Sequence, residues 1–140
     1  MVKINDEIKK LFRDKKEPGF IATLGADGKI NLSCKGSLDV LDDEHIWFSE
    51  STGKKTYRNL LKNPYVSVAI AKRDTSDGYQ LRGKAELVTE GPFYEMAVKN
   101  TEQVSVRLGR KLPKPLAAVR IKVDEIYSLK SGPGAGERIA

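Results

Sequence analysis

The sequence predicts a mainly β domain of the α+β class, in which short antiparallel strands form a barrel and short helices lie in the connections. Polar and apolar residues alternate along several short segments, and turn-forming residues such as Asp27-Gly28 separate neighbouring segments. Other segments show the wider spacing of apolar residues that is typical of helices. With 140 residues, the chain has the length of one domain and enough residues for a core.

The N-terminal part predicts a helix followed by a strand and a turn. A short amphipathic helix is expected over residues 5–15, because the apolar residues there share one face: Ile4, Ile8, Leu11 and Phe12. Residues 20–24 are predicted to form a strand, and residues 26–28 a hairpin turn.

Residues 29–41 are predicted to form one long strand with a buried face. The even-numbered positions are apolar or small, whereas the odd-numbered positions are polar. Since side chains alternate between the two faces of a strand, the even-numbered face should pack in the core. That face carries Cys34, the only cysteine, which is therefore expected to be a small buried hydrophobic residue rather than a redox thiol.

The remaining chain predicts four further strands and two more helices, one within residues 49–64 and one after residue 90. Strands are expected over residues 45–49, 65–72 and 79–87 and around Val119, Ile121 and Val123. Gly83, inside one of these strands, predicts a bend or bulge. Gly91-Pro92 is typical of a helix start.

The predicted domain covers residues 1–130. Residues 131–140 are rich in glycine and are expected to form a flexible C-terminal tail. Trp47 alternates with Ile46 and Phe48, so it should lie on the opposite face of the sheet, under a helix or at a subunit interface.

Residues 49–64 combine the features of an anion-binding site at a strand-to-helix junction. Thr52 is a good N-cap, so a helix is expected to start near Gly53 and to end at Asn63-Pro64. The free N–H groups of its first turn would attract a phosphate group. The neighbouring basic and hydroxyl side chains would face the same point: Ser49, Ser51, Thr52, Lys54, Lys55 and Thr56. The alternative is a capped surface helix with solvated lysines.

Composition excludes several kinds of site and leaves the partner open. One cysteine and one histidine exclude an intrachain disulfide framework and a zinc cluster. No apolar run is long enough to span a membrane and no signal peptide is recognisable, so a cytoplasmic protein without a membrane partner is expected. The net charge of +6 favours an anionic partner, but charge alone does not distinguish nucleic acid, a membrane surface and a phosphorylated small molecule.

The order of the elements resembles that of a known family. The resemblance covers about residues 5–129 and is carried by Phe20-Ile21-Ala22-Thr23-Leu24 before Asp27-Gly28, Asn31-Leu32-Ser33-Cys34-Lys35, Lys55-Thr56 with Asn59 and Asn63-Pro64, and Gln80-Leu81-Arg82-Gly83-Lys84-Ala85. In these pieces the chain resembles the FMN-binding split barrels related to pyridoxamine phosphate oxidase, especially the small FMN-binding proteins among them. The resemblance implies a six-stranded antiparallel split β-barrel with Greek-key topology, FMN as the cofactor, and a homodimer with FMN between its subunits.

The resemblance also implies which residues hold the flavin. The second strand and the start of the following helix would bind the phosphate, which agrees with the anion site inferred above. Backbone groups of residues 32–34 and 49–51 would meet the ring edge, and Gln80 is either an amide contact or an exposed strand residue. The candidate cofactor-binding residues are Asn31, Leu32, Ser33, Cys34, Lys35, Ser49, Glu50, Ser51, Gly53, Lys54, Lys55, Thr56 and Gln80.

The expected function is that of an FMN-dependent oxidoreductase or electron-transfer protein with a small-molecule or protein redox partner. No catalytic residue is evident, which is compatible with this function because the flavin ring itself carries the electrons. B6 oxidation is not expected, since no histidine-bearing segment follows the last strand. The alternatives are a deazaflavin (F420) protein, a non-catalytic flavin carrier, and a nucleic-acid-binding barrel, which is disfavoured because the strands lack interleaved surface aromatic residues.

Overall fold

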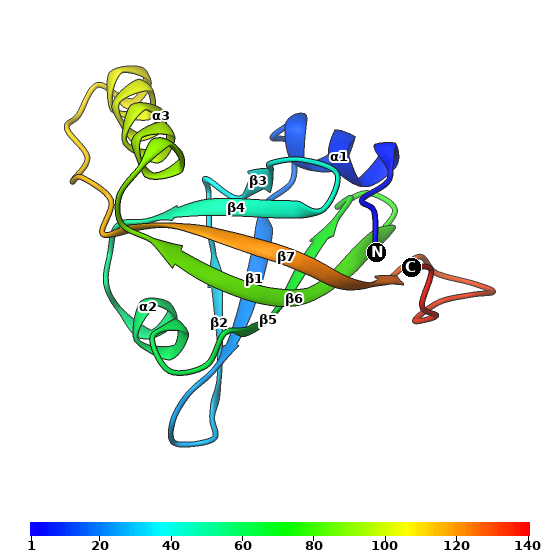
Figure 1. The fold of residues 1–140 in the computed structure, drawn as a ribbon. Coiled ribbons are helices and arrows are strands. Elements are labelled where there is room, and N and C mark those ends of the chain that lie inside the picture. The colour runs from blue at the N-terminus through cyan, green and yellow to red at the C-terminus, as the bar shows by residue number, and fades with distance from the viewer.

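Seven antiparallel strands form one curled sheet in the computed structural model, which describes residues 1–140 (Figure 1). The strand order is β2-β1-β5-β6-β7-β4-β3. The strands are β1 (Gly19–Leu24), β2 (Ile30–Cys34), β3 (Asp39–Val40), β4 (His45–Glu50), β5 (Tyr65–Ala71), β6 (Gly78–Val88) and β7 (Ala117–Ser128), and the helices are α1 (Asp6–Arg13), α2 (Lys55–Leu60) and α3 (Pro92–Leu108). Because β2 and β3 are the two edges and do not pair, the barrel is split between them.

The predicted fold is confirmed, with one difference in the number of strands. The sequence predicted six strands, and the structure has seven, because a turn at residues 35–38 divides the predicted strand 29–41 into β2 and β3. Its closing bond runs from the Leu38 N–H to the Lys35 carbonyl, 3.1 Å. The two pieces then pair with different neighbours, β2 with β1 and β3 with β4.

The main core fills the concave side of the sheet and is covered at one end by α1. The predicted N-terminal helix is confirmed: Asn5 caps α1 by accepting a bond from the Ile8 N–H, 2.9 Å. Ile8 and Phe12 of this helix are buried against sheet residues such as Val68 and Ile121.

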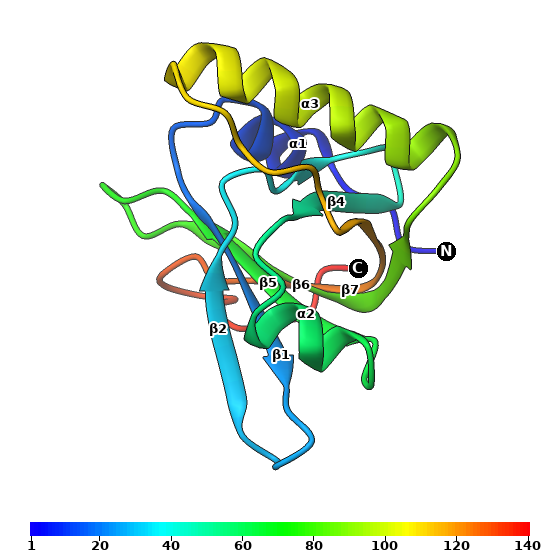
Figure 2. The same cartoon turned by 90° about the vertical axis from the view of Figure 1, so that its left-hand side faces the viewer.

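A smaller cluster lies between α3 and the outer side of β4 and β7. Trp47 packs there with Tyr94, Ala97 and Ala118, and its ring meets Phe93 edge to face at 5.8 Å. Of the two positions predicted for Trp47, the structure shows the one under a helix. Helix α3 lies at the same end of the molecule as α1 (Figure 2).

A bulge in β6 bends the long β6–β7 ribbon, as the sequence predicted at Gly83. The pairing register shifts between Arg82 and Gly83. A Cβ atom at Gly83 would lie only 2.0 Å from the carbonyl oxygen of Lys122, so no other residue fits there without moving the backbone.

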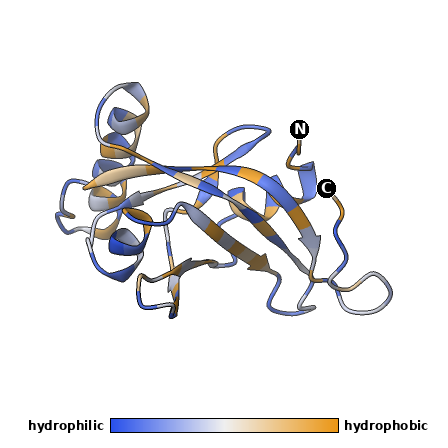
Figure 3. Cartoon of the chain, turned by 60° about the horizontal axis from the view of Figure 1, so that its bottom comes forward, coloured by the Kyte–Doolittle hydropathy of each residue, from blue (hydrophilic) through white to orange (hydrophobic).

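The buried face predicted for residues 29–41 is wrong for β2. Ile30 and Leu32 are 78% and 67% exposed, and Cys34 is exposed as well. These side chains continue the convex face of β1, with Leu32 opposite Ala22, and no helix of the chain covers that face. Alternating bands of hydrophobic and hydrophilic residues run along the strands, but alternation alone does not say which band is covered (Figure 3).

The last ten residues return to the end of β7. The N–H of Ile139 donates to the carbonyl of Ile126, 2.8 Å, and the guanidinium of Arg138 lies 3.3 Å from Glu125. Ala140 packs against the main core. The flexibility expected of this tail stays a prediction. No helix of the chain is long and apolar enough to cross a lipid bilayer.

Candidate functional site

The site predicted from the sequence lies at the free edge of the sheet, where β2 faces α2 and the connection between β4 and α2. The N–H of Lys35 donates to the carbonyl of Gly19, 3.2 Å, and the N–H of Gly25 to that of Lys29, 2.8 Å. In an antiparallel pair the bonded positions alternate, so odd-numbered residues of β2 bond to β1. The backbone groups of Leu32 and Cys34 therefore point to the free edge, where a ligand can reach them.

The odd-numbered side chains of β2 point toward α2 and the β4–α2 connection. The amide of Asn31 donates to the hydroxyl of Thr56, 3.2 Å, and the ammonium of Lys35 donates to Glu50, 2.9 Å. These bonds join segments about 15 to 25 residues apart in the sequence and hold β2 against α2 and the β4–α2 connection. The polar residues of β2 therefore form a junction with the start of α2.

The buried side chain of Glu50 holds the connection between β4 and α2 in place through hydrogen bonds. Its side chain is completely buried, and its second carboxylate oxygen accepts bonds from the N–H groups of Thr52 and Gly53 at 3.0 and 3.2 Å and from the Thr52 hydroxyl at 3.1 Å. Burial raises the pKa of Glu50, but the bond to Lys35, its charge and these backbone donors outweigh burial and hold the pKa below its usual value. Glu50 is therefore an internal anion, and both its oxygens are occupied by the chain itself.

The predicted start of α2 is wrong by two residues. The helix begins at Lys55, and Thr52 does not cap it, because Glu50 holds the Thr52 side chain and N–H. Gly53 has a φ of +65°, a left-handed conformation that no residue of a right-handed helix adopts, so Gly53 cannot belong to α2. The amides of residues 52 and 53 thus serve Glu50 and are not free for a ligand.

The donors that remain open surround the start of α2. Lys54 and Lys55 are exposed, and neither forms an ion pair within the chain. Thr56 is buried beside Asn31. The hydroxyl oxygen of Ser49 is buried without a hydrogen-bond partner, whereas its N–H is bonded to Ser37, 3.0 Å. Ser49 pairs with Ala118, which packs under α3 with Trp47, so the Ser49 side chain lies on the α3 face of β4 and not beside the start of α2.

The structure brings most of the predicted residues together but separates one of them. The neighbouring group consists of Asn31, Leu32, Ser33, Cys34, Lys35, Ser49, Glu50, Ser51, Gly53, Lys54, Lys55 and Thr56. Within it, Cys34 and Leu32 offer only backbone groups, since their side chains lie on the convex face. Gln80 lies on β6, which is separated from β2 by the two strands β1 and β5, and its amide donates to Ser67, 2.8 Å.

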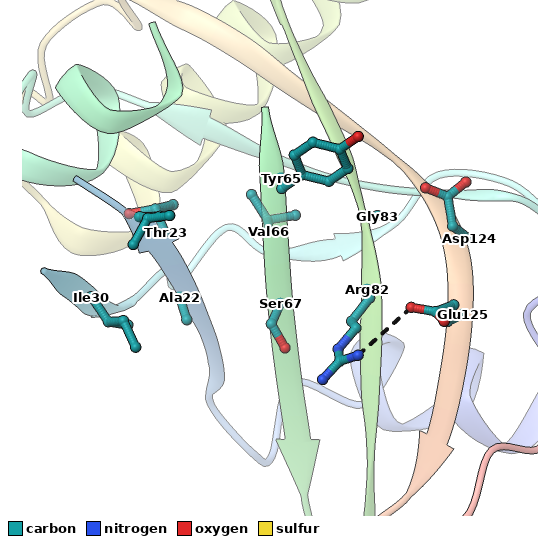
Figure 4. Close-up of a pocket in the computed structure, with 11 residues that line it drawn as sticks. Ala22, Thr23, Ile30, Tyr65, Val66, Ser67, Arg82, Gly83, Asp124 and Glu125 are labelled. Atoms are coloured by element: carbon teal, nitrogen blue, oxygen red, sulfur yellow. Dashed lines mark ion pairs between the residues drawn. The ribbon is translucent and has the colours of Figure 1, made fainter. Parts of the chain in front are cut away.

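A hollow on the convex face was missed by sequence reasoning (Figure 4). Its volume is about 490 Å³, and it lies across β1, β5, β6 and β7 between Tyr65 and the ion pair of Arg82 with Glu125, 3.8 Å. Gly83 lines it, at the bulge that bends the ribbon. The glycine in the strand was the available signal, but the sequence does not show what lies beside the bend.

Two comparisons with known proteins reach over nearly the whole chain. An uncharacterized protein of Methanocaldococcus jannaschii is 38% identical over 142 residues, which cover 100% of this chain and 90% of that one. The crystal structure of HupZ from Group A Streptococcus is 33% identical, covers 95% of this chain and 99% of its own, and has a TM-score of 0.80.

A third comparison and a family match agree with the architecture. An FMN-binding protein from Syntrophomonas wolfei subsp. wolfei, 16% identical, superposes with a TM-score of 0.75 over 89% of this chain and 85% of that one, and so shares the fold. The sequence model of the family described as pyridoxamine 5'-phosphate oxidase matches residues 4–130. The resemblance inferred from the sequence is thereby confirmed, and the chain belongs to the pyridoxamine 5'-phosphate oxidase family.

Proposed function

We propose that the chain binds FMN at the junction between β2 and the start of α2. The observation that carries this proposal is the set of groups there that the chain itself leaves open: the two unpaired lysines Lys54 and Lys55 and the backbone groups of Leu32 and Cys34 at the free edge of β2. Membership of the family and the fold shared with an FMN-binding protein support a flavin as the ligand.

The two sides of the junction between β2 and α2 suit the two parts of FMN. Lys54 and Lys55 would hold the phosphate with Thr56 and Asn31, because charged donors and hydroxyls bind phosphate oxygens strongly. The free backbone N–H and C=O groups of Leu32 and Cys34 would meet the ring edge, whose oxygen and nitrogen atoms need both donors and acceptors. Glu50 would hold the connection in shape and not touch the cofactor. Bound FMN supplies the electron or hydride transfer.

We also propose a homodimer that uses the convex face of the sheet. Its apolar side chains are exposed although they lie side by side on paired strands: Phe20, Leu24, Ile30, Leu32 and Tyr65. Monomeric proteins rarely leave such a patch uncovered. Gln80 lies on this same face, so a flavin between subunits would meet Gln80 only from the second subunit.

With FMN bound, the protein would act as an oxidoreductase or electron-transfer protein. The junction between β2 and α2 contains no histidine, since the only one, His45, lies at the other end of β4 and bonds to Asp42, 2.8 Å. The residues of this junction therefore bind and orient the ring, and proton transfer is left to the flavin and its partner. No histidine follows β7, so oxidation of a B6 vitamer is not part of the proposal.

The first test is the absorption spectrum of the purified protein, followed by the mass of the cofactor released on denaturation. FMN would give the flavin spectrum and mass. A deazaflavin would overturn the choice of cofactor, and a protein that stays colourless and does not bind added FMN would overturn the proposed function.

The second test replaces Lys55 by Ala. Loss of a charge-assisted bond to phosphate should cost roughly 1.5 to 3 kcal/mol, which weakens FMN binding by about tenfold to 150-fold. Riboflavin lacks the phosphate, so its binding should hardly change. Lys62→Ala, an exposed lysine just beyond α2, is the matched control and should leave both ligands unaffected. Equal weakening of FMN and riboflavin would contradict a phosphate contact at Lys55.

A further inference from the structure

A dense group of positive charges lies where α3 ends and the connection to β7 begins. Residues 103–116 contain four cationic side chains and no acidic one: Arg107, Arg110, Lys111 and Lys114. All four are exposed, and none takes part in an ion pair within the chain. Much of the net charge of +6 is therefore concentrated on one short segment.

The helix end accounts for only one of these cations. Arg107 lies in the last turn of α3, where a positive charge stabilises the helix. The other three follow the C-cap Gly109, so they lie beyond the turn in which the helix dipole acts. The ammonium of Lys114 lies 5.7 Å from the centre of the Tyr94 ring, which positions this cation but supplies no counter-charge.

The chain holds this segment in one shape. The N–H of Leu112 donates to the hydroxyl of Ser105, 3.0 Å, and the hydroxyl of Tyr94 donates to the carbonyl of Pro115, 2.7 Å. The end of α3 and the connection after it lie at an outer corner of the molecule, at the end opposite the β1–β2 hairpin (Figure 2). Residues 106–114, here called the basic corner, therefore present their cations together at a place that a large partner can reach.

Exposed aliphatic side chains lie among the cations of the basic corner. Residues 106–111 are all exposed, and they include Val106 at 82% and Leu108 at 51%. The basic corner contains no aromatic residue, so it lacks the rings on which proteins stack the bases of single-stranded nucleic acid. Cations next to aliphatic side chains suit the surface of an anionic bilayer, whose headgroups attract cations and whose interface accepts apolar groups.

We propose that the basic corner binds the surface of a membrane that contains anionic lipids. Its cations contact the lipid phosphate groups, and Val106 and Leu108 enter the boundary between headgroups and acyl chains. The sequence predicted no membrane partner because it contains no segment long enough to span a membrane, but a surface contact needs no such segment. Binding is reversible, since a few cations give only a modest attraction to the surface.

The test is sedimentation of the intact protein with lipid vesicles. Vesicles of equimolar phosphatidylcholine and phosphatidylglycerol should carry the protein down at low salt and release it at high salt, because salt screens exposed charges. Vesicles of phosphatidylcholine alone should leave it in solution. Equal binding to the two kinds of vesicle, or binding to neither, would overturn the proposal.

Charge-reversed variants locate the contact. Arg110→Glu combined with Lys111→Glu should weaken vesicle binding at least about twentyfold, because each cation at the surface contributes about fivefold. The matched control is Lys29→Glu combined with Lys62→Glu, which has the same net charge and changes two exposed, unpaired lysines outside the basic corner. The control should retain most of the binding. An equal loss in the control would show that net charge alone drives binding and would overturn the site.

Val106→Ser distinguishes a lipid surface from another polyanion. Loss of an apolar side chain that enters the bilayer should weaken vesicle binding by about fivefold. The same variant should bind a double-stranded DNA oligonucleotide as weakly as the wild type does. Unchanged vesicle binding by Val106→Ser, or tighter binding of the oligonucleotide than of the vesicles at the same salt, would contradict a lipid partner. These experiments need no flavin, so their outcome is independent of that of the FMN titration.

Discussion

Replacement of Glu50 by Gln tests whether the buried ion pair of Lys35 and Glu50 holds β2 against the β4–α2 connection. Glu50 is fully buried and the side chain of Lys35 is only 12% exposed, so the variant leaves an ammonium with almost no access to water and no counter-charge. Removal of one partner from a buried pair typically costs about 3 to 5 kcal/mol. The amides of Thr52 and Gly53 also lose a charged acceptor. We therefore expect the free energy of unfolding to fall by roughly 3 kcal/mol or more.

The assay is urea unfolding followed by the fluorescence of Trp47, which lies in the cluster under α3. The double variant Lys35→Met with Glu50→Gln should recover part of the loss, because no uncompensated charge remains. Glu86→Gln is the matched control: its partner Arg120 lies 2.8 Å away, but the pair is on the surface. That change should cost about 1 kcal/mol or less.

Two results would refute the reasoning about Glu50. One is a loss in Glu50→Gln no larger than in the surface control. The other is a double variant whose loss equals the sum of the two single losses, since that would mean that the two side chains do not interact.

Three further predictions follow from the structure. The pKa of Glu50 lies below 4.5 in the fold, so as the pH falls the unfolded chain takes up a proton at Glu50 before the folded chain does. The contribution of ionised Glu50 to the folding stability is therefore complete above about pH 5 and is lost as the pH falls through the pKa of the folded state. Acid titration should destabilise the wild type more than Glu50→Gln. Leu32→Asp on the convex face should produce a monomer in sedimentation, whereas Val106→Asp, 82% exposed on α3, should not; a monomeric wild type would contradict the proposed dimer. Gly83→Ala should lower the free energy of unfolding by roughly several kcal/mol, because the new Cβ would clash with the backbone of Lys122. Gly36→Ala has open space around its Cβ and should hardly change thermal unfolding.

The sequence by itself determined the kind of elements and most of their order. Apolar spacing in the N-terminal segment predicted α1, alternation predicted the strands, and Gly83 predicted the bulge. These signals are local: each depends on residues a few positions apart, whose side-chain directions follow from the backbone geometry of a helix or strand. The family resemblance then supplied the antiparallel split-barrel architecture.

Only the tertiary structure decided which face of a strand is covered and which donors remain free. Cys34 and Leu32 belong to an alternating pattern, but β2 is an edge strand and nothing covers their face, so they are exposed. Thr52 carries a capping signal, but the buried carboxylate of Glu50 takes its hydroxyl and its N–H, and α2 starts later. Burial and hydrogen bonding depend on segments that are far apart in the chain, and the local pattern of a segment does not say which other segment will lie against it.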